Sequence, residues 1–146
     1  MISGGRRFSA FLPILLIGLF LRLFFLIQVR TVLPDEAYYM RIARTIVQEG
    51  CYGGIDEGQA GYRAQPLIPA VFSWAYRIAP AAAQSVCAIL SLAAGLAAIA
   101  LVFFGAQKIL PDTASRWAAF ALAISPAMIQ DSIFSGTHSF FNLFFL

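Results

Sequence analysis

Charge and cysteine are both scarce in this 146-residue chain. Charged residues make up 12% of the sequence, about half of the quarter that is usual in soluble domains. Hydrophobic residues make up 60%, which excludes an intrinsically disordered protein and a soluble nucleic-acid-binding module. Two cysteines are too few for a secreted disulfide scaffold. Stretches of about 20 apolar residues instead predict an all-α integral membrane protein with a single membrane domain.

Apolar runs predict three to four transmembrane helices, at residues 8–29, 81–110 and 117–129, with a fourth starting at 132–146. The first run, about 22 residues, would reach about 33 Å as a helix, which is enough to cross the hydrocarbon core. It is too long for the apolar region of a signal peptide, so we interpret it as a retained anchor. After Trp117, a single kinked helix of about 30 residues is the alternative, because Pro126 interrupts the run.

The positive residues predict which side of the membrane each loop faces. Arg6 and Arg7 precede the first run, and Lys108 and Arg116 flank the turn after the second. Because positive charge favours the cytoplasmic side, we expect the N-terminus in the cytoplasm and residues 30–80 outside. The chain ends inside an apolar run, so we expect it to be the front third of a longer fold.

The outer loop contains two short segments that predict interfacial helices. The first, 36–49, would follow a cap at Asp35 and end at Gly50. Its apolar positions follow a helical period: Tyr39, Ile42, Ala43, Ile46 and Val47. Its other face would carry Arg41, Arg44, Thr45 and Gln48. We therefore expect this helix to lie in the membrane interface with its apolar face down.

The second short segment, 70–78, follows Pro66 and Pro69 after a glycine-rich loop. It carries Trp74 and Arg77, and this combination is typical of the boundary between membrane and water. We expect a second interfacial helix here.

Four residues in and near the outer loop have both a structural and a functional interpretation. Asp35 and Glu36 suit the start of a helix, but either carboxylate could also take a proton from a hydroxyl group. Arg63 could contact lipid headgroups or clamp a phosphate, since the arginine fork matches phosphate oxygens. Arg22 lies inside an apolar run, where it could snorkel to the headgroups, pair with another group or bind a lipid phosphate.

In the order of these features, the chain resembles the start of a GT-C membrane glycosyltransferase, of the protein-mannosyltransferase-like and aminoarabinose-transferase-like kind. The first matching residues are Leu-Pro-Asp-Glu-Ala-Tyr-Tyr-Met-Arg-Ile-Ala-Arg at 33–44, after an anchor containing Leu21-Arg22-Leu23. The others are Glu49-Gly50-Cys51-Tyr52, Tyr62-Arg63-Ala64-Gln65-Pro66-Leu67-Ile68-Pro69, and Ser125-Pro126 with a polar residue twelve positions after the proline. The resemblance covers the whole chain and about the first third of a typical family member.

By this resemblance, the chain would transfer a sugar from a polyprenyl-phosphate carrier to an acceptor hydroxyl, with inversion, on the outer face of a bacterial inner membrane. Asp35 would be the catalytic base, with Glu36 beside it, and Arg63 and Arg22 would contact the donor phosphate. Two departures stand out. The chain has Arg63-Ala64-Gln65-Pro66 where the family has Arg-Pro-Pro or Glu-Lys-Pro-Pro, and His138 where the family has an acidic residue. Asp131, seven residues earlier, is the alternative to His138 as a second polar site.

The alternative function is a non-catalytic transmembrane subunit of a larger membrane complex, derived from this family. If the chain ends at Leu146, it would lack the helices that complete the active site. Small residues four apart would then pack against the first segment or against another subunit: Ser91, Ala94, Gly95 and Ala98. The phenylalanine-rich C-terminal segment would serve the same purpose. The sequence contains no cofactor motif and no nucleic-acid signature; a divalent metal and a Cys51–Cys87 disulfide are left open.

Overall fold

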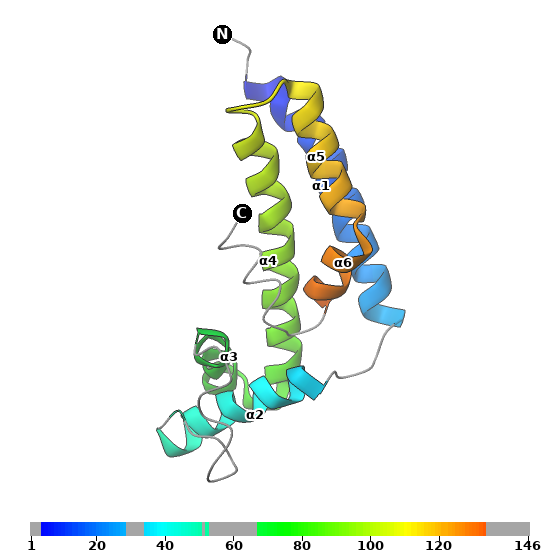
Figure 1. Cartoon of the computed structure of the whole chain (residues 1–146). Helices are drawn as coiled ribbons and strands as arrows, with labels where there is room; N and C mark the ends of the chain where they lie inside the picture. The colour runs from blue at the N-terminus through cyan, green and yellow to red at the C-terminus, as the bar shows by residue number, and fades with distance from the viewer. Residues whose placement is uncertain (1–3, 29–33, 51, 53–66, 134–146) are drawn as a thin grey trace.

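The computed structural model describes residues 4–28, 34–50, 52 and 67–133. These ranges contain seven helical elements, and Figure 1 shows how they are arranged. They are α1 (Gly4–Gln28), α2 (Pro34–Glu49), α3 (Leu67–Ile78), the 3₁₀ turn η1 (Pro80–Ala82), α4 (Ala83–Ala106), α5 (Asp112–Ile124) and α6 (Pro126–Ile133). The predicted all-α fold is confirmed for this part of the chain, which contains no strand.

Two stretches are long and apolar enough to cross a membrane, Ser9–Gln28 in α1 and Pro80–Ala106 over η1 and α4. Fewer than half of the residues in either stretch are buried within the protein. Large apolar side chains such as Phe20, Ile27 and Ile89 are exposed on their surfaces. Exposed apolar surface of this extent is costly in water and favourable in lipid, which supports the predicted membrane location.

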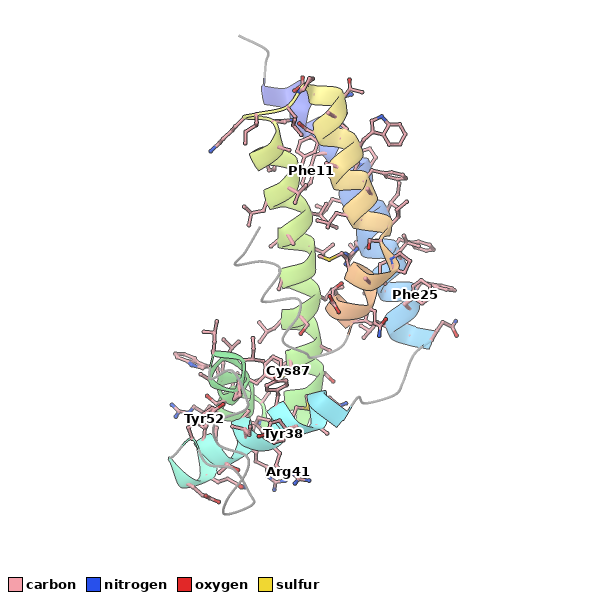
Figure 2. The ribbon with its side chains drawn as sticks, viewed as in Figure 1. Phe11, Phe25, Tyr38, Arg41, Tyr52 and Cys87 are labelled. Carbon is pink, nitrogen blue, oxygen red and sulfur yellow. The ribbon has the colours of Figure 1, made fainter. Side chains whose placement is uncertain are left out.

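The long helices α1 and α4 pack with α5 into a three-helix bundle (Figure 1). Its core combines the Phe11 ring of α1 with Ile99 and Phe103 of α4 and the small side chains of Ala119 and Ala123 on α5. The ring centroids of Phe11 and Phe103 are 4.9 Å apart. Figure 2 shows Phe11 near the N-terminal end of α1. Small residues on α5 face large ones on α1 and α4, so the three helices approach closely.

The predicted segment 117–129 is interrupted in the structure, and its limits need correction. Helix α5 begins earlier, at Asp112, and ends at Ile124, where Ser125 takes an extended conformation with ψ of 121°. Pro126 lacks the N–H that would continue the helix, so a separate helix, α6, starts there. Figure 1 shows α6 turned toward α4 rather than continuing along α5. Most of the predicted segment 132–146 lies outside the described residues.

Helices α2 and α3 lie across the first turns of α4, at the end of the molecule opposite the chain's N-terminus (Figure 1). They share a second core with the start of α4, built from Met40 and Ala43 of α2, Ile68, Phe72 and Ala75 of α3, and Ala83 and Cys87. The apolar face of α2, which we expected to lie down on the membrane, therefore packs on α3 in a core that also includes the start of α4. Exposed Arg41 points away from the long helices in Figure 2.

Two local details of α2 differ from the sequence-based expectation. The helix begins at Pro34, so Asp35 belongs to its first turn and not to the capping position. Proline suits the first helical position, because its fixed φ angle is close to the helical value and the N–H that it lacks would have no partner within the helix. Thr45, expected on the polar face, is buried, and its hydroxyl donates a hydrogen bond to the Arg41 carbonyl at 3.1 Å. This local bond satisfies the hydroxyl within the helix.

The buried and exposed faces of α2 predict unequal effects for two nearby positions. Ile42→Asp puts a carboxylate at a position that is 1% exposed, and we expect a loss of about 3 kcal/mol or more because the charge has no partner there. Arg44→Ala changes an exposed side chain, and we expect less than about 1 kcal/mol. Limited proteolysis after α2 measures the difference. Equal protection in the two variants would contradict the assigned faces.

Candidate functional site

The proposed catalytic carboxylates lie at one end of the molecule. Asp35 and Glu36 are in the first turn of α2, which lies across the end of α4. Their side chains are outside the described part, as are Arg63 and His138. The catalytic and phosphate-binding roles of these residues therefore stay predictions from the sequence.

A polar group with several hydrogen bonds is the Arg22 guanidinium of α1, which is fully buried. Its Nε donates a hydrogen bond to the Ser132 hydroxyl of α6 at 2.8 Å. Its Nη1 donates to the Gly18 carbonyl in α1 and to the Ala123 carbonyl in α5, both at 3.0 Å. One side chain thus connects three helices.

The position of Arg22 follows from the break after α5. The carbonyl of Ala123 is among the last four of α5, which have no partner inside their own helix. The C-terminal end of a helix also carries a partial negative charge, which favours a nearby cation. Arg22 supplies both the missing donor and the positive charge, while its Nε holds α6 on the other side of the break.

Two glycines make room for this arrangement. A Cβ on Gly95 of α4 would lie 2.4 Å from the Ser132 Cβ and 3.4 Å from the Arg22 Nε. A Cβ on Gly18 would lie 2.8 Å from the Ile99 Cδ1 and 3.3 Å from the Arg22 Nη1. Both distances under 3.0 Å are too short for real side chains. At Gly95 the clash is with a Cβ that cannot move without its helix, so the close approach of α4 to α6 requires glycine there, whereas at Gly18 the end of the Ile99 side chain would have to shift.

The four small residues predicted as a packing face all lie buried within the described bundle. All four are buried, and they lie on one side of α4: Ser91, Ala94, Gly95 and Ala98. The predicted alternatives were packing against the first segment or against another subunit. The contact around Gly95 is internal, and it involves α6 as well as Arg22 of the first segment.

Among the residues that the structure describes, two buried polar atoms have no hydrogen-bond partner, Arg22 Nη2 and Ser91 Oγ. Within the described ranges, the three acceptors of the guanidinium are all uncharged. Of the three alternatives predicted for Arg22, the structure shows pairing with groups inside the bundle, because in a low-dielectric interior the open carbonyl and the hydroxyl are close acceptors. Its contact with a donor phosphate stays a prediction.

Gly95→Ala is expected to destabilise the bundle, whereas Gly105→Ala, on the same helix, is expected to stabilise it. The first substitution forces α4 and α6 apart and should cost about 1–3 kcal/mol. The second meets no atom within 4 Å, so it should gain about 0.5–1 kcal/mol from the lower flexibility of alanine. Thermal unfolding in detergent measures both.

Ser132 provides the control for Gly95→Ala. In the Gly95→Ala background, Ser132→Gly should cost less stability than it does in the unchanged protein, because it also removes the clashing Cβ, whereas Ser132→Ala keeps that Cβ and should show a much smaller difference between the two backgrounds. A stabilised Gly95→Ala protein would contradict the close contact.

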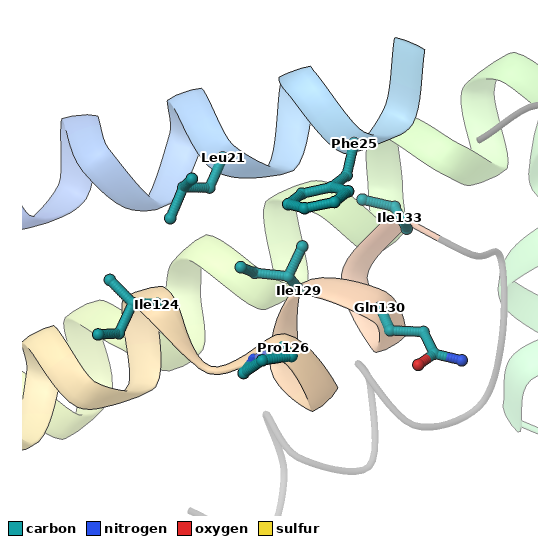
Figure 3. Close-up of a pocket in the computed structure, with 7 residues that line it drawn as sticks. All are labelled: Leu21, Phe25, Ile124, Pro126, Ile129, Gln130 and Ile133. Atoms are coloured by element: carbon teal, nitrogen blue, oxygen red, sulfur yellow. The ribbon is translucent and has the colours of Figure 1, made fainter. Parts of the chain in front are cut away.

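An apolar pocket of about 500 Å³ lies beside this polar group, between α1 and the α5–α6 break. It is lined by Leu21, Phe25, Ile124, Pro126, Ile129, Gln130 and Ile133. Figure 3 shows Leu21 and Phe25 facing the side chains of α5 and α6, with the Gln130 amide pointing away from them. This lining suits a hydrocarbon group and offers no acid–base pair.

Other polar candidates form no cluster in the described ranges. No group of three or more histidine, cysteine or acidic side chains lies close enough there to bind a metal. Asp131 is half-buried on α6. Cys87 is buried against α3, while Cys51 lies outside the described residues. Burial raises the pKa of Tyr76, and a neighbouring Cys87 thiolate would raise it further, while Arg44 lowers it.

No protein-family model, curated protein or solved structure matches the chain.

Proposed function

We propose that the chain is a glycosyltransferase-like membrane protein of the GT-C kind, which acts on a polyprenyl-phosphate sugar at the outer membrane face. One observation carries the proposal. An acidic pair follows a membrane-length helix and opens a helix, α2, that lies across the end of the next membrane-length helix. A carboxylate there would meet both a lipid-linked donor and a water-soluble acceptor.

In the proposed reaction, Asp35 takes the proton from the acceptor hydroxyl. The acceptor oxygen then forms a bond to the anomeric carbon from the face opposite the phosphate. The bond between the anomeric carbon and the phosphate oxygen breaks, and polyprenyl phosphate leaves with both bonding electrons. Arg63 balances the negative charge on this leaving group, which an arginine fork suits well. One displacement inverts the anomeric configuration.

A non-catalytic membrane subunit is the second candidate function. It is favoured by the pocket beside α6, whose lining is apolar except for Gln130. The two candidates differ in one measurement: transfer of radiolabelled sugar from a polyprenyl-phosphate donor by the purified protein with whatever copurifies. Transfer that depends on Asp35 supports the enzyme, and its absence from an intact, inserted protein supports the subunit.

A further inference from the structure

We propose that α3, and not α2, is the helix that docks on the lipid surface. It would do so through an exposed strip made of Leu67, Trp74 and Ile78, with Arg77 at its edge; we call these four residues the α3 strip. The inference rests on the membrane location in the proposed function and not on the transfer chemistry.

Helix α3 is apolar on two faces, and among the described residues only one of these faces is buried. Ile68, Phe72 and Ala75 contact α2 and α4 and are at most 2% exposed. Leu67, Trp74 and Ile78 are 49%, 67% and 76% exposed. Residues seven and eleven positions apart fall on the same side of a helix, so these three side chains form one continuous strip.

Helix α2 is apolar on one face only. On that face, Met40 and Ala43 are buried in the core shared with α3 and the start of α4, and Tyr39, Ile46 and Val47 are half-buried. Its exposed residues include Arg41, Arg44, Gln48 and Glu49. A face with this composition suits water or headgroups, so α2 has no apolar surface of comparable size left for the bilayer.

The position of α3 identifies the bilayer as the occupant of the strip. In Figure 1, α3 lies on the same side of α2 as the long helices, beside the first turns of α4. Ile78 is followed by Ala79 and then by η1, where the membrane-length stretch Pro80–Ala106 starts. Hydrogen bonds from Ala79 N to Ala75 O (2.9 Å) and from Ala82 N to Ala79 O (3.0 Å) hold this connection. The strip thus ends at the level where the chain enters the membrane.

The chemistry of the strip also matches the interface. Tryptophan concentrates at the boundary between headgroups and acyl chains, because its ring is apolar and its N–H is polar. Arg77, exposed in the last turn of α3, can contact lipid phosphates while its stem lies along the apolar strip. The bilayer interface offers both contacts at once.

Trp74 can report on its own surroundings, because the chain has only two tryptophans. Trp117→Phe removes the other, an exposed side chain on α5, and leaves Trp74 as the only indole. The protein is reconstituted into phosphatidylcholine vesicles whose acyl chains carry bromine near the headgroup or near the chain end. We expect clear quenching of Trp74 emission, greater with shallow than with deep bromines. We also expect quenching by acrylamide several-fold weaker than for free tryptophan.

The matched control moves the probe to α2. Gln48→Trp, made together with Trp74→Phe and Trp117→Phe, puts the only indole on the polar face of α2. We expect this indole to be quenched by acrylamide and hardly by bromolipid. Trp74 open to acrylamide and insensitive to bromolipid would overturn the proposal. Trp74 shielded from both quenchers would also overturn it, since a protein would then cover the strip. Sugar transfer is not measured, so the glycosyltransferase proposal can fail while this one holds.

Discussion

Asp35→Asn is expected to lower sugar transfer by about 10²- to 10⁴-fold while the protein stays folded and inserted. Loss of a general base typically costs this much in rate, because asparagine cannot accept the proton of the acceptor hydroxyl. Asp35 lies in the first turn of α2, where a negative charge is favoured by the helix dipole. Its neutral replacement should therefore cost less than about 1 kcal/mol of stability. The measurement compares transfer rates at equal amounts of purified, inserted protein.

Glu36→Gln is the matched control for this experiment. It removes the same charge from the same helical turn, but its position lies about 100° further around the helix axis. We expect a much smaller loss of transfer than with Asp35→Asn, at a similar thermal stability. Undiminished transfer in Asp35→Asn would remove the catalytic assignment, and equal losses in both variants would indicate a general charge effect instead.

The helices were accessible from sequence because each depends on residues close together in the chain. The run around Leu21 is apolar for long enough to predict α1, and the 3.6-residue period of α2 identifies Ile42 and Ala43 as buried. The partner of that buried face was not predictable in the same way. A hydrophobic period indicates that a face is covered but does not identify what covers it, so a bilayer and a helix such as α3 predict the same pattern at Ala43.

The environment of Arg22 depended on contacts that no local pattern contains. Its bond to Ser132 joins residues 110 positions apart, and its bond to Ala123 exists because α5 stops at Ile124. Pro126 in the sequence indicated that break. Arg22 within an apolar run indicated that its guanidinium would need hydrogen-bond acceptors inside the protein. To predict that Arg22 binds at this break, one must know which residues of α1 and α5 lie at the same level, and only the folded bundle shows that. The small residues around Gly95 indicated close packing, but only the folded structure shows that the neighbour of Gly95 is Ser132.

Arg22→Lys is expected to destabilise the bundle more than Arg22→Met, although lysine is the closer chemical relative. Lysine keeps the positive charge, but a single ammonium group cannot reproduce the fork that bonds Ala123 and Ser132 together. Losing two hydrogen bonds to a charged group should cost about 3–5 kcal/mol. Methionine loses the same bonds but also removes the cost of a charge inside the membrane, about 2.5–3.5 kcal/mol on insertion scales. We therefore expect a net loss of only about 1–2 kcal/mol for Arg22→Met, which reversible unfolding in mixed detergent–SDS micelles can measure.

Ser132→Ala separates the fork from the charge in the same assay. It removes the acceptor of the Nε bond and leaves Arg22 and its bond to Ala123 in place, so we expect an intermediate loss of about 1.5–3 kcal/mol. In the Arg22→Met background the same substitution should cost far less, because the bond is already absent, and the difference gives the coupling energy between the two side chains. If Arg22→Lys were as stable as the unchanged protein while Arg22→Met unfolded, the positive charge and not the geometry of the fork would hold α5 and α6 at their break.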